Sequence, residues 1–193
     1  MSGSNEARDA RADRLLSAAS DALNADPAAT MGQIAAAAGV GRATLHRHFA
    51  TRDDLIVAVG DFALDRWEAT LHASGAVALD ADTPAERHRE VLGDLVRRFV
   101  ADAGEFSFAM SNPDLEHHPA LVDRVGALIA LDVRMLSAAQ AAGVLRDDMP
   151  PEWIDHVLFG LLRAAVDAER YGDVAPRAIP DLVASTFFAA VGR

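Results

Sequence analysis

Apolar residues recur at three- and four-residue spacing along nearly the whole chain, and no segment alternates convincingly between apolar and polar residues. Spacing of this kind places the apolar side chains on one face of a helix. Alanine, leucine and arginine, which favour helical backbone, are abundant. The pattern therefore predicts an all-α protein.

Segments that contain proline, glycine or aspartate separate the predicted helices. The helices are expected over residues 6–25, 31–37, 42–49, 52–73, 84–103, 105–111, 119–142, 151–171 and 177–191. Several starts carry a capping signal, a hydroxyl followed three residues later by Gln, Asp or Glu. These signals are Thr30 with Gln33, Thr51 with Asp54, and Thr83 with Glu86, the last with Pro84 at the first helical position.

The bulk properties narrow the class of protein. A chain of 193 residues forms one moderately large domain or a small domain joined to a larger one. It contains no cysteine, which excludes disulfides and thiolate chemistry and fits a reducing compartment. We find no signal peptide and no uncharged apolar run of the roughly 18–20 residues that span a bilayer. We therefore expect a cytoplasmic protein with no membrane partner.

Charge is distributed unevenly along this acidic chain, whose formal net charge is −11. All 18 basic residues are arginine. From Pro27 to Arg52 there is no acidic residue, while basic and histidine side chains accumulate. They are Arg42, His46, Arg47, His48 and Arg52. This stretch is the candidate surface for a polyanion.

The two short helices around the sequence AAGVG meet the requirements of a helix-turn-helix. Ala35 permits close approach of the two helices, and Gly39 supplies a residue free to adopt positive φ in the turn. The apolar anchors are Ile34 and Ala38 on the first helix and Val40, Leu45 and Phe49 on the second. The alternative, a purely structural helix pair, does not explain why the outward face lacks acids.

The outward face of the second helix carries the candidate DNA contacts. Arg42 lies in the first turn, where its guanidinium can span guanine O6 and N7. Thr44, His46, His48 and Arg52 can donate to phosphate oxygens, and the helix that begins near Arg52 directs its partial positive charge at the same backbone. The predicted DNA-binding residues are Thr30, Arg42, Ala43, Thr44, His46, Arg47, His48 and Arg52.

Residues 8–60 resemble the DNA-binding signature of the TetR family. The resemblance is carried by Thr30, Ile34-Ala35, Ala38-Gly39-Val40, Thr44-Leu45, His48-Phe49, Arg52 and Leu55. It implies a homodimeric, ligand-controlled transcription factor, usually a repressor, with an N-terminal three-helix DNA-binding domain and a larger helical ligand-binding and dimerisation domain. The chain departs from the family pattern at Gly41, His46 and Arg52, where serine, tyrosine and lysine are usual.

The rest of the chain is expected to sense a ligand and to dimerise. We place the boundary between 1–52 and 53–193 and expect residues 1–5 to be disordered. The predicted dimer interface comprises Leu158, Leu161, Leu162, Ala165, Leu182, Val183, Thr186, Phe187 and Ala190. Burial of these side chains within one subunit is the alternative. A pocket for an unknown, hydrophobic small molecule is assigned to Trp67, Phe99, Phe106, Met110, His117 and Val125.

Other chemistry receives weaker support. The sequence PDLEHHPAL brings together four possible metal ligands, Asp114, Glu116, His117 and His118. A helical metal centre would need a recurring Glu-x-x-His pair, and none recurs elsewhere, so we interpret the segment as a polar connection before a helix. Arg8, Arg11 and Arg14 form a candidate stripe toward the DNA backbone. We find no nucleotide-binding, hydrolase or metalloprotease motif, and we predict no enzyme, metal or cofactor.

The sequence also allows two alternatives from other functional classes. The first is a helical small-molecule-binding protein or enzyme with an incidental helix-turn-helix, which predicts no salt-sensitive DNA binding. The second is a protein-interaction module that uses the C-terminal helices on a different partner.

Overall fold

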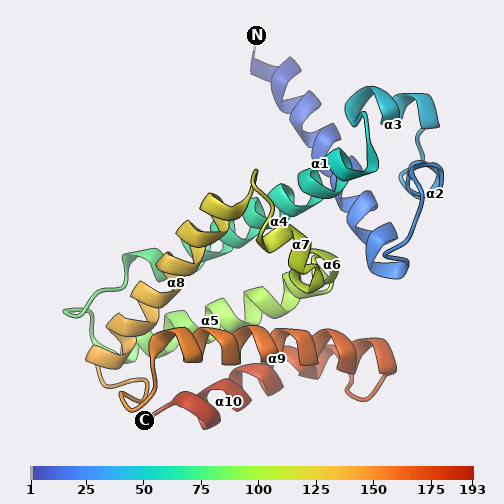
Figure 1. The fold of residues 1–193 in the computed structure, drawn as a ribbon. Helices are drawn as coiled ribbons and strands as arrows, with labels where there is room; N and C mark the ends of the chain where they lie inside the picture. The colour runs from blue at the N-terminus through green and yellow to red at the C-terminus, as the bar shows by residue number, and fades with distance from the viewer. Residues whose placement is uncertain (1) are drawn as a thin grey trace. The chain divides into compact units, whose positions relative to one another are not determined.

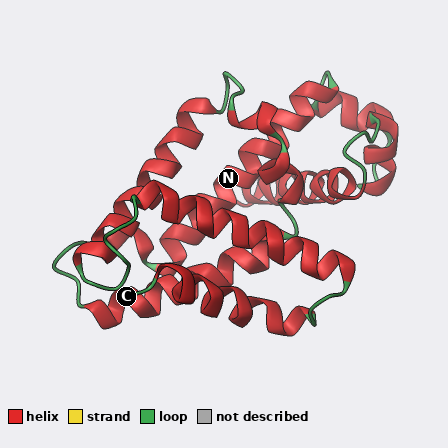
Figure 2. Ribbon diagram, turned by 60° about the horizontal axis from the view of Figure 1, so that its bottom comes forward, coloured by secondary structure: helices red, strands yellow, loops and turns green. Residues whose placement is uncertain are grey.

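The structure, a computed structural model, describes residues 2–193, with side chains from residue 12 onward. It consists of helices and connecting loops, with no β-strand in the described residues (Figures 1 and 2). This confirms the predicted all-α class. The α-helices are α1 (Ser2–Ala25), α2 (Met31–Ala37), α3 (Arg42–His48), α4 (Arg52–Ser74), α5 (Ala85–Ala103), α6 (Ser107–Ser111), α7 (Pro113–Glu116), α8 (Val122–Ala141), α9 (Pro151–Tyr171) and α10 (Ile179–Val191).

The predicted helices agree with the structure to within a few residues, and two local predictions were wrong. Helix α7 lies inside a segment expected to be a loop: Asn112 caps it by accepting from the backbone N–H of Asp114, and Pro113 occupies its first turn. Thr83 does not cap α5. Its hydroxyl donates to Asp80 Oδ1 at 2.7 Å, which closes the preceding turn and leaves Pro84 at the N-cap position.

Short 3₁₀ turns, η1 (Ala76–Ala78) and η2 (Pro176–Ala178), precede α5 and α10. The predicted helix 177–191 is therefore divided between η2 and α10. After α10 the chain forms an isolated antiparallel bridge between Leu145 and Gly192. None of the described helices is both long and apolar enough to cross a membrane.

The chain packs into two compact units that interleave along the sequence. Unit 1 contains residues 1–65 and 105–124, and unit 2 contains residues 66–104 and 125–193. The boundary predicted between residues 52 and 53 separates functional domains and stays a prediction, since these two units are defined by packing alone. Helix α4 begins in unit 1 and ends in unit 2, and Glu105–Arg124 returns to unit 1.

In unit 1, hydrogen bonds join α1 to the segment that follows α5. Ser20 Oγ and Asn24 Nδ2 both donate to the Glu105 carbonyl, at 2.6 and 2.7 Å. Asn24 Oδ1 accepts from the Phe108 N–H at 2.7 Å and from the Ser107 hydroxyl at 3.0 Å. Because these groups are partly buried, the bonds define where Glu105–Phe108 lies against α1.

The same segment also packs against the first half of α4. Arg124 Nη1 lies 2.6 Å from Asp61 Oδ1. A Cβ placed on Gly60 would lie 2.8 Å from Leu121 Cδ1 and 3.1 Å from Leu115 Cδ2. Glycine at position 60 therefore permits close packing of α4 against these two leucines.

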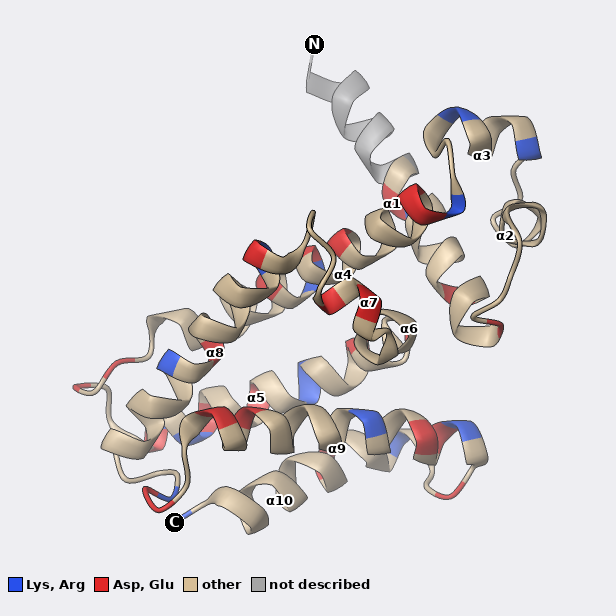
Figure 3. Ribbon diagram, viewed as in Figure 1, with Lys and Arg blue, Asp and Glu red and all other residues tan. Residues whose placement is uncertain are grey.

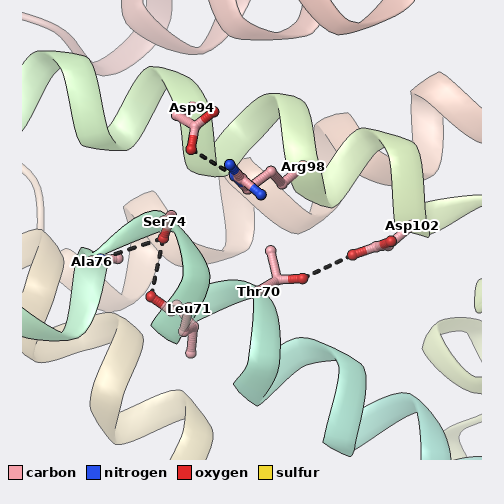
Figure 4. A network of polar contacts seen from close by, with 7 residues as sticks. All are labelled: Thr70, Leu71, Ser74, Ala76, Asp94, Arg98 and Asp102. Atoms are coloured by element: carbon pink, nitrogen blue, oxygen red, sulfur yellow. Dashed lines mark hydrogen bonds and ion pairs between the residues drawn. The ribbon is translucent and has the colours of Figure 1, made fainter.

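Unit 2 is centred on α5, α9 and α10, which pack against one another. The second half of α4 joins α5 through Thr70, whose hydroxyl donates to Asp102 Oδ2 at 2.8 Å, while Asp94 and Arg98 pair one turn apart along α5 (Figure 4). Burying a leucine- or phenylalanine-sized side chain here contributes roughly 1.5–3 kcal/mol each.

The core of unit 2 corrects part of the predicted dimer interface. Leu158, Leu162, Ala165, Val183 and Phe187 are each at most 6% exposed within the single subunit. Leu161 is half-buried, whereas Leu182, Thr186 and Ala190 are exposed. The alternative of burial within the subunit thus holds for the first five residues, because α9 and α10 direct their most apolar faces at each other and at α5.

Candidate nucleic-acid interface

The turn between α2 and α3 has the geometry that the sequence predicted. Gly39 adopts φ +65°, and no atom would crowd a Cβ there, so the backbone angle alone requires glycine. The N–H of Val40 bonds to the Ala35 carbonyl at 3.0 Å and closes the end of α2. Ile34 and Leu45 are fully buried and Ala35 is 2% exposed, so both helices are anchored on one side.

Capping boxes define the starts of α2 and α4. The Thr30 N–H donates to Gln33 Oε1 at 2.8 Å, and Thr30 Oγ1 accepts from the Gln33 N–H. In the same way Thr51 N–H donates to Asp54 Oδ2 at 2.9 Å while Asp54 N–H donates to Thr51 Oγ1 at 3.0 Å. The bond from Thr51 lowers the pKa of the Asp54 carboxyl. Both capping predictions are confirmed.

The outward face of α3 is exposed and carries basic residues without any acidic residue (Figure 3). Arg42, Ala43, His46, Arg47 and His48 are exposed, and Thr44 is half-buried. Arg42 Nε lies 3.5 Å from His46 Nε2, one turn along the helix. Arg47 forms no ion pair or hydrogen bond with any described residue, so its guanidinium is available to an external anion.

Arg52 has a different environment from the other basic residues. Its Nε donates to the Ala29 carbonyl at 3.0 Å, and its Nη2 donates to the Pro27 carbonyl at 2.5 Å. The side chain thus ties the start of α4 to the loop between α1 and α2. The sequence predicted that Arg52 donates to a DNA phosphate. In the structure Arg52 instead bonds to two carbonyl groups of its own chain, and no local sequence pattern predicts these bonds.

Comparison with known proteins places this arrangement in a family. Residues 15–59 match the family model described as bacterial regulatory proteins, tetR family. The chain is 31% identical over 170 residues to the HTH-type transcriptional regulator NfxB of Pseudomonas aeruginosa, covering 84% of each protein. It belongs to the TetR family. The chain is therefore a DNA-binding transcriptional regulator.

Other relatives include the HTH-type transcriptional repressor LfrR of Mycolicibacterium smegmatis, 28% identical over 158 residues, which span 82% of this chain and 78% of LfrR. The crystal structure of LfrR from Mycobacterium smegmatis in complex with proflavine superimposes with a TM-score of 0.75 at 26% identity, covering 94% of this chain and 96% of that one. The resemblance to this TetR-like structure thus extends through both units.

Compared with the TetR-family pattern, Gly41 leaves α3 with an N-cap that makes no side-chain hydrogen bond. A serine would fit, because a Cβ at position 41 meets only Thr44 Oγ1, at 3.9 Å. The start of α3 in this TetR-family member therefore lacks a hydroxyl that could cap the helix or reach a phosphate.

The residues predicted to line the ligand pocket of the regulator divide between the two units. In unit 2, Trp67 and Phe99 both contact Phe159, with ring centroids 5.0 and 6.5 Å away. Phe106, Met110 and His117 belong to unit 1, where the Phe106 ring contacts Phe62 at 5.7 Å. Val125 belongs to unit 2 and is half-buried. The assignment of these six residues to one ligand pocket stays a prediction.

Three residues of this TetR-family regulator were missed by sequence reasoning. Phe159 joins the Trp67 and Phe99 rings, and Asp132 and Asp155 are buried polar residues of unit 2. The two aspartates could have been found from the sequence, because each is the single acidic residue in a mostly apolar segment. These segments are ALIALDVRML for Asp132 and WIDHVLF for Asp155. An acid at a core position is rare unless it is paired or functional.

In the regulator, His117 and His118 lie between α7 and α8 and bond to nearby backbone groups. His117 Nδ1 lies 3.0 Å from the Pro113 carbonyl, and His118 Nδ1 accepts from the Ala120 N–H at 3.2 Å. Among residues whose side chains are described, no group of three or more His, Asp or Glu could hold a metal ion. Of the arginine stripe on α1, the side chains of Arg8 and Arg11 lie outside the part of the chain that the structure describes. The disorder of residues 1–5 stays a prediction, because residue 1 and the side chains of residues 2–5 are not described.

Proposed function

We propose that this TetR-family protein is a homodimeric repressor that binds a palindromic operator and is released from it by a small molecule. The observation that carries the DNA-binding part is the exposed, acid-free face of α3 on a correctly formed helix-turn-helix. As a bacterial DNA-binding regulator it would act in the cytoplasm. The relatives named as transcriptional repressor and regulator support the same function.

In this proposal α3 enters the major groove. Arg42 in its first turn reads base edges, and Arg47 and His48 contact phosphates from the exposed face. The Ala43 methyl can pack against a thymine methyl. Arg52 contributes mainly by holding the start of α4, whose N-terminal end then faces the DNA backbone.

Dimerisation is proposed through the exposed faces of α9 and α10. On α9, Trp153, Gly160, Ala164 and Tyr171 recur at helical spacing on the side opposite the buried face, and all four are exposed. On α10 the corresponding exposed residues include Leu182, Thr186 and Ala190. Two such helix pairs form a four-helix bundle about a two-fold axis, which suits a palindromic site with half-sites roughly 34–36 Å apart.

Release by a ligand requires that unit 2 influence unit 1 through the chain itself. The chain passes between the units within α4 and at the two ends of Glu105–Arg124. That segment is bonded to α1 through Asn24 and to α4 through Arg124. A ligand that favours one arrangement of unit 2 would therefore act on both α1 and α4, and so on the separation of the two α3 helices.

Genomic fragments selected for binding provide the operator for the decisive test. We expect Arg47→Ala to weaken operator binding about tenfold and to lower the slope of log affinity against log salt concentration by about one, because one phosphate contact is lost. The matched control is Arg163→Ala, an exposed arginine on α9. Equal affinity and salt slope for wild type and Arg47→Ala would overturn the assignment of α3.

A further inference from the structure

Unit 2 buries two carboxyl groups on neighbouring elements. Asp132 on α8 is fully buried, and Asp155 on α9 is 4% exposed. The Trp67 indole of α4 donates from Nε1 to Asp132 Oδ2 at 3.1 Å. No Arg or His of the described side chains forms an ion pair with either carboxyl group. Buried acids without a counter-ion are costly, so their retention in a core calls for an explanation.

Each of these carboxyl groups has one oxygen with nothing to bond to. Among the described residues, Asp132 Oδ1 and Asp155 Oδ1 are buried and have no hydrogen-bond partner. Burial, together with the neighbouring Asp155, raises the pKa of Asp132 to about 8. Burial raises the pKa of Asp155 to about 6, against the opposing effect of His156. At neutral pH the pair therefore carries less than its full negative charge, and a cation brought to it would restore that charge.

Aromatic rings adjoin the acids. Phe159 lies one helical turn after Asp155 on α9, and its ring contacts the Trp67 ring at 5.0 Å, edge to face. Phe99 of α5 also contacts Phe159, with ring centroids 6.5 Å apart. Trp67 and Phe159 are only half-buried, whereas both aspartates are buried. Solvent therefore reaches the rings before it reaches the acids.

Rings that approach a cation with their faces, next to carboxylates that neutralise it, are the chemistry by which proteins recognise organic cations. We propose that Trp67, Asp132, Asp155 and Phe159 form the effector subsite of this regulator and that its ligand class is a flat aromatic cation. A neutral ligand without a hydrogen-bond donor would leave the two carboxyl oxygens unpaired. A metal ion is disfavoured because no third ligand accompanies the pair among the described side chains. That binding of this cation releases the protein from DNA rests on the proposed function.

The proposal couples binding of the cation to loss of protons. The groups that act on Asp132 are Asp155 of α9 and the Trp67 indole of α4, and the group that acts on Asp155 is His156. A permanent cation favours the ionised carboxylates, so it displaces protons wherever they are still bound. Its affinity should rise as the pH increases through the interval from about 6 to about 8, the pKa values of the two acids.

The test uses N-methylacridinium, whose charge is permanent, and acridine, a neutral ligand of nearly the same shape at pH 8. Binding to the full-length protein without DNA is followed by dye fluorescence. We expect the cation to bind wild type roughly tenfold or more tightly than acridine. Asp132→Asn and Asp155→Asn should each remove most of that preference while leaving the affinity for acridine within about twofold.

The matched control is Asp123→Asn, an exposed aspartate near the start of α8, which should behave as wild type. Equal affinity of wild type for the two probes, or Asn variants that keep the full preference for the cation, would overturn the proposal. If an Asn variant fails to fold, the pH dependence of the wild-type protein still tests the proposal. An affinity for N-methylacridinium that does not change between pH 6 and pH 8.5 would contradict the proposed subsite.

A separate titration of the protein–operator complex distinguishes this inference from the proposed function. Operator binding that N-methylacridinium abolishes supports both. Selective cation binding without release from DNA supports the subsite and contradicts ligand-controlled repression through it. Operator binding by a protein with no preference for the cation supports the DNA-binding function and contradicts the subsite.

Discussion

Arg52 illustrates why the role of a residue depends on what its side chain contacts. It belongs to the acid-free stretch and aligns with a basic position of the TetR pattern, which by itself suggests a phosphate ligand. In the structure its guanidinium donates to the carbonyl groups of Ala29 and Pro27. It therefore joins the start of α4 to the loop that precedes α2, and only part of its donor capacity remains for DNA.

Two substitutions separate the charge of Arg52 from its hydrogen bonds. Arg52→Lys keeps the charge but cannot span both carbonyls, so we expect the free energy of unfolding to fall by about 1–2 kcal/mol with a nearly unchanged salt slope. Arg52→Gln should lower stability similarly and also reduce the salt slope of operator binding. Urea denaturation and binding titrations measure the two effects. A lysine variant as stable as wild type would show that the bonds do not matter.

Gly39 and Thr83 show which local predictions from the sequence hold in the structure and which do not. Gly39 was predicted to adopt positive φ, and it does, because a turn between two helices requires it. Thr83 carried an equally good capping signal, yet its hydroxyl bonds to Asp80 instead. A short polar side chain can reach several backbone and carboxyl groups nearby, so the choice among them depends on the exact course of the turn.

At the scale of elements, polar side chains of α1 bond to the segment between α5 and α6, and Asn24 and Ser20 both donate to the Glu105 carbonyl. Asn24 accepts from the Phe108 N–H and donates to the Glu105 carbonyl, so it satisfies groups on both sides of the turn. These bonds join residues more than eighty positions apart along the chain. They hold Glu105–Phe108 against α1 within unit 1.

Replacing Asn24 by leucine preserves most of the side-chain volume but removes these bonds. We expect Asn24→Leu to lower the free energy of unfolding by about 1–3 kcal/mol, because the partly buried Phe108 N–H loses its partner, whereas the Glu105 carbonyl keeps its bond from Ser20. It should also weaken the response of operator binding to ligand. Asp21→Ala, an exposed substitution on the same helix, is the control. An Asn24→Leu protein with wild-type stability and response would contradict the role given to this contact.

At the scale of the whole molecule, the structure changes which substitutions test the dimer. Phe187 was predicted at the interface but is fully buried in the subunit, so Phe187→Arg would unfold unit 2 rather than separate two subunits. Leu182 on the same helix is 48% exposed. It is the better probe of the proposed interface, because a charge there disturbs no internal packing.

We expect Leu182→Arg to sediment as a monomer with wild-type helix content, and to lose tight operator binding because the two half-sites are no longer bound together. Arg177→Ala, an exposed change in η2, should leave the dimer intact. Analytical ultracentrifugation and circular dichroism measure the two properties. A wild-type protein that sediments as a monomer would exclude the homodimer.

The sequence by itself determined the helices other than α7, the turn at Gly39, two capping boxes and the acid-free outward face of α3. These features depend on residues within about four positions of one another, where periodicity and hydrogen bonding are local. Only the tertiary structure decided which face of α9 is buried, that Arg52 bonds to Ala29, and that Asp132 lies beside Trp67. Those outcomes depend on which distant helices pack together, and many apolar faces compete for that packing with similar free energies.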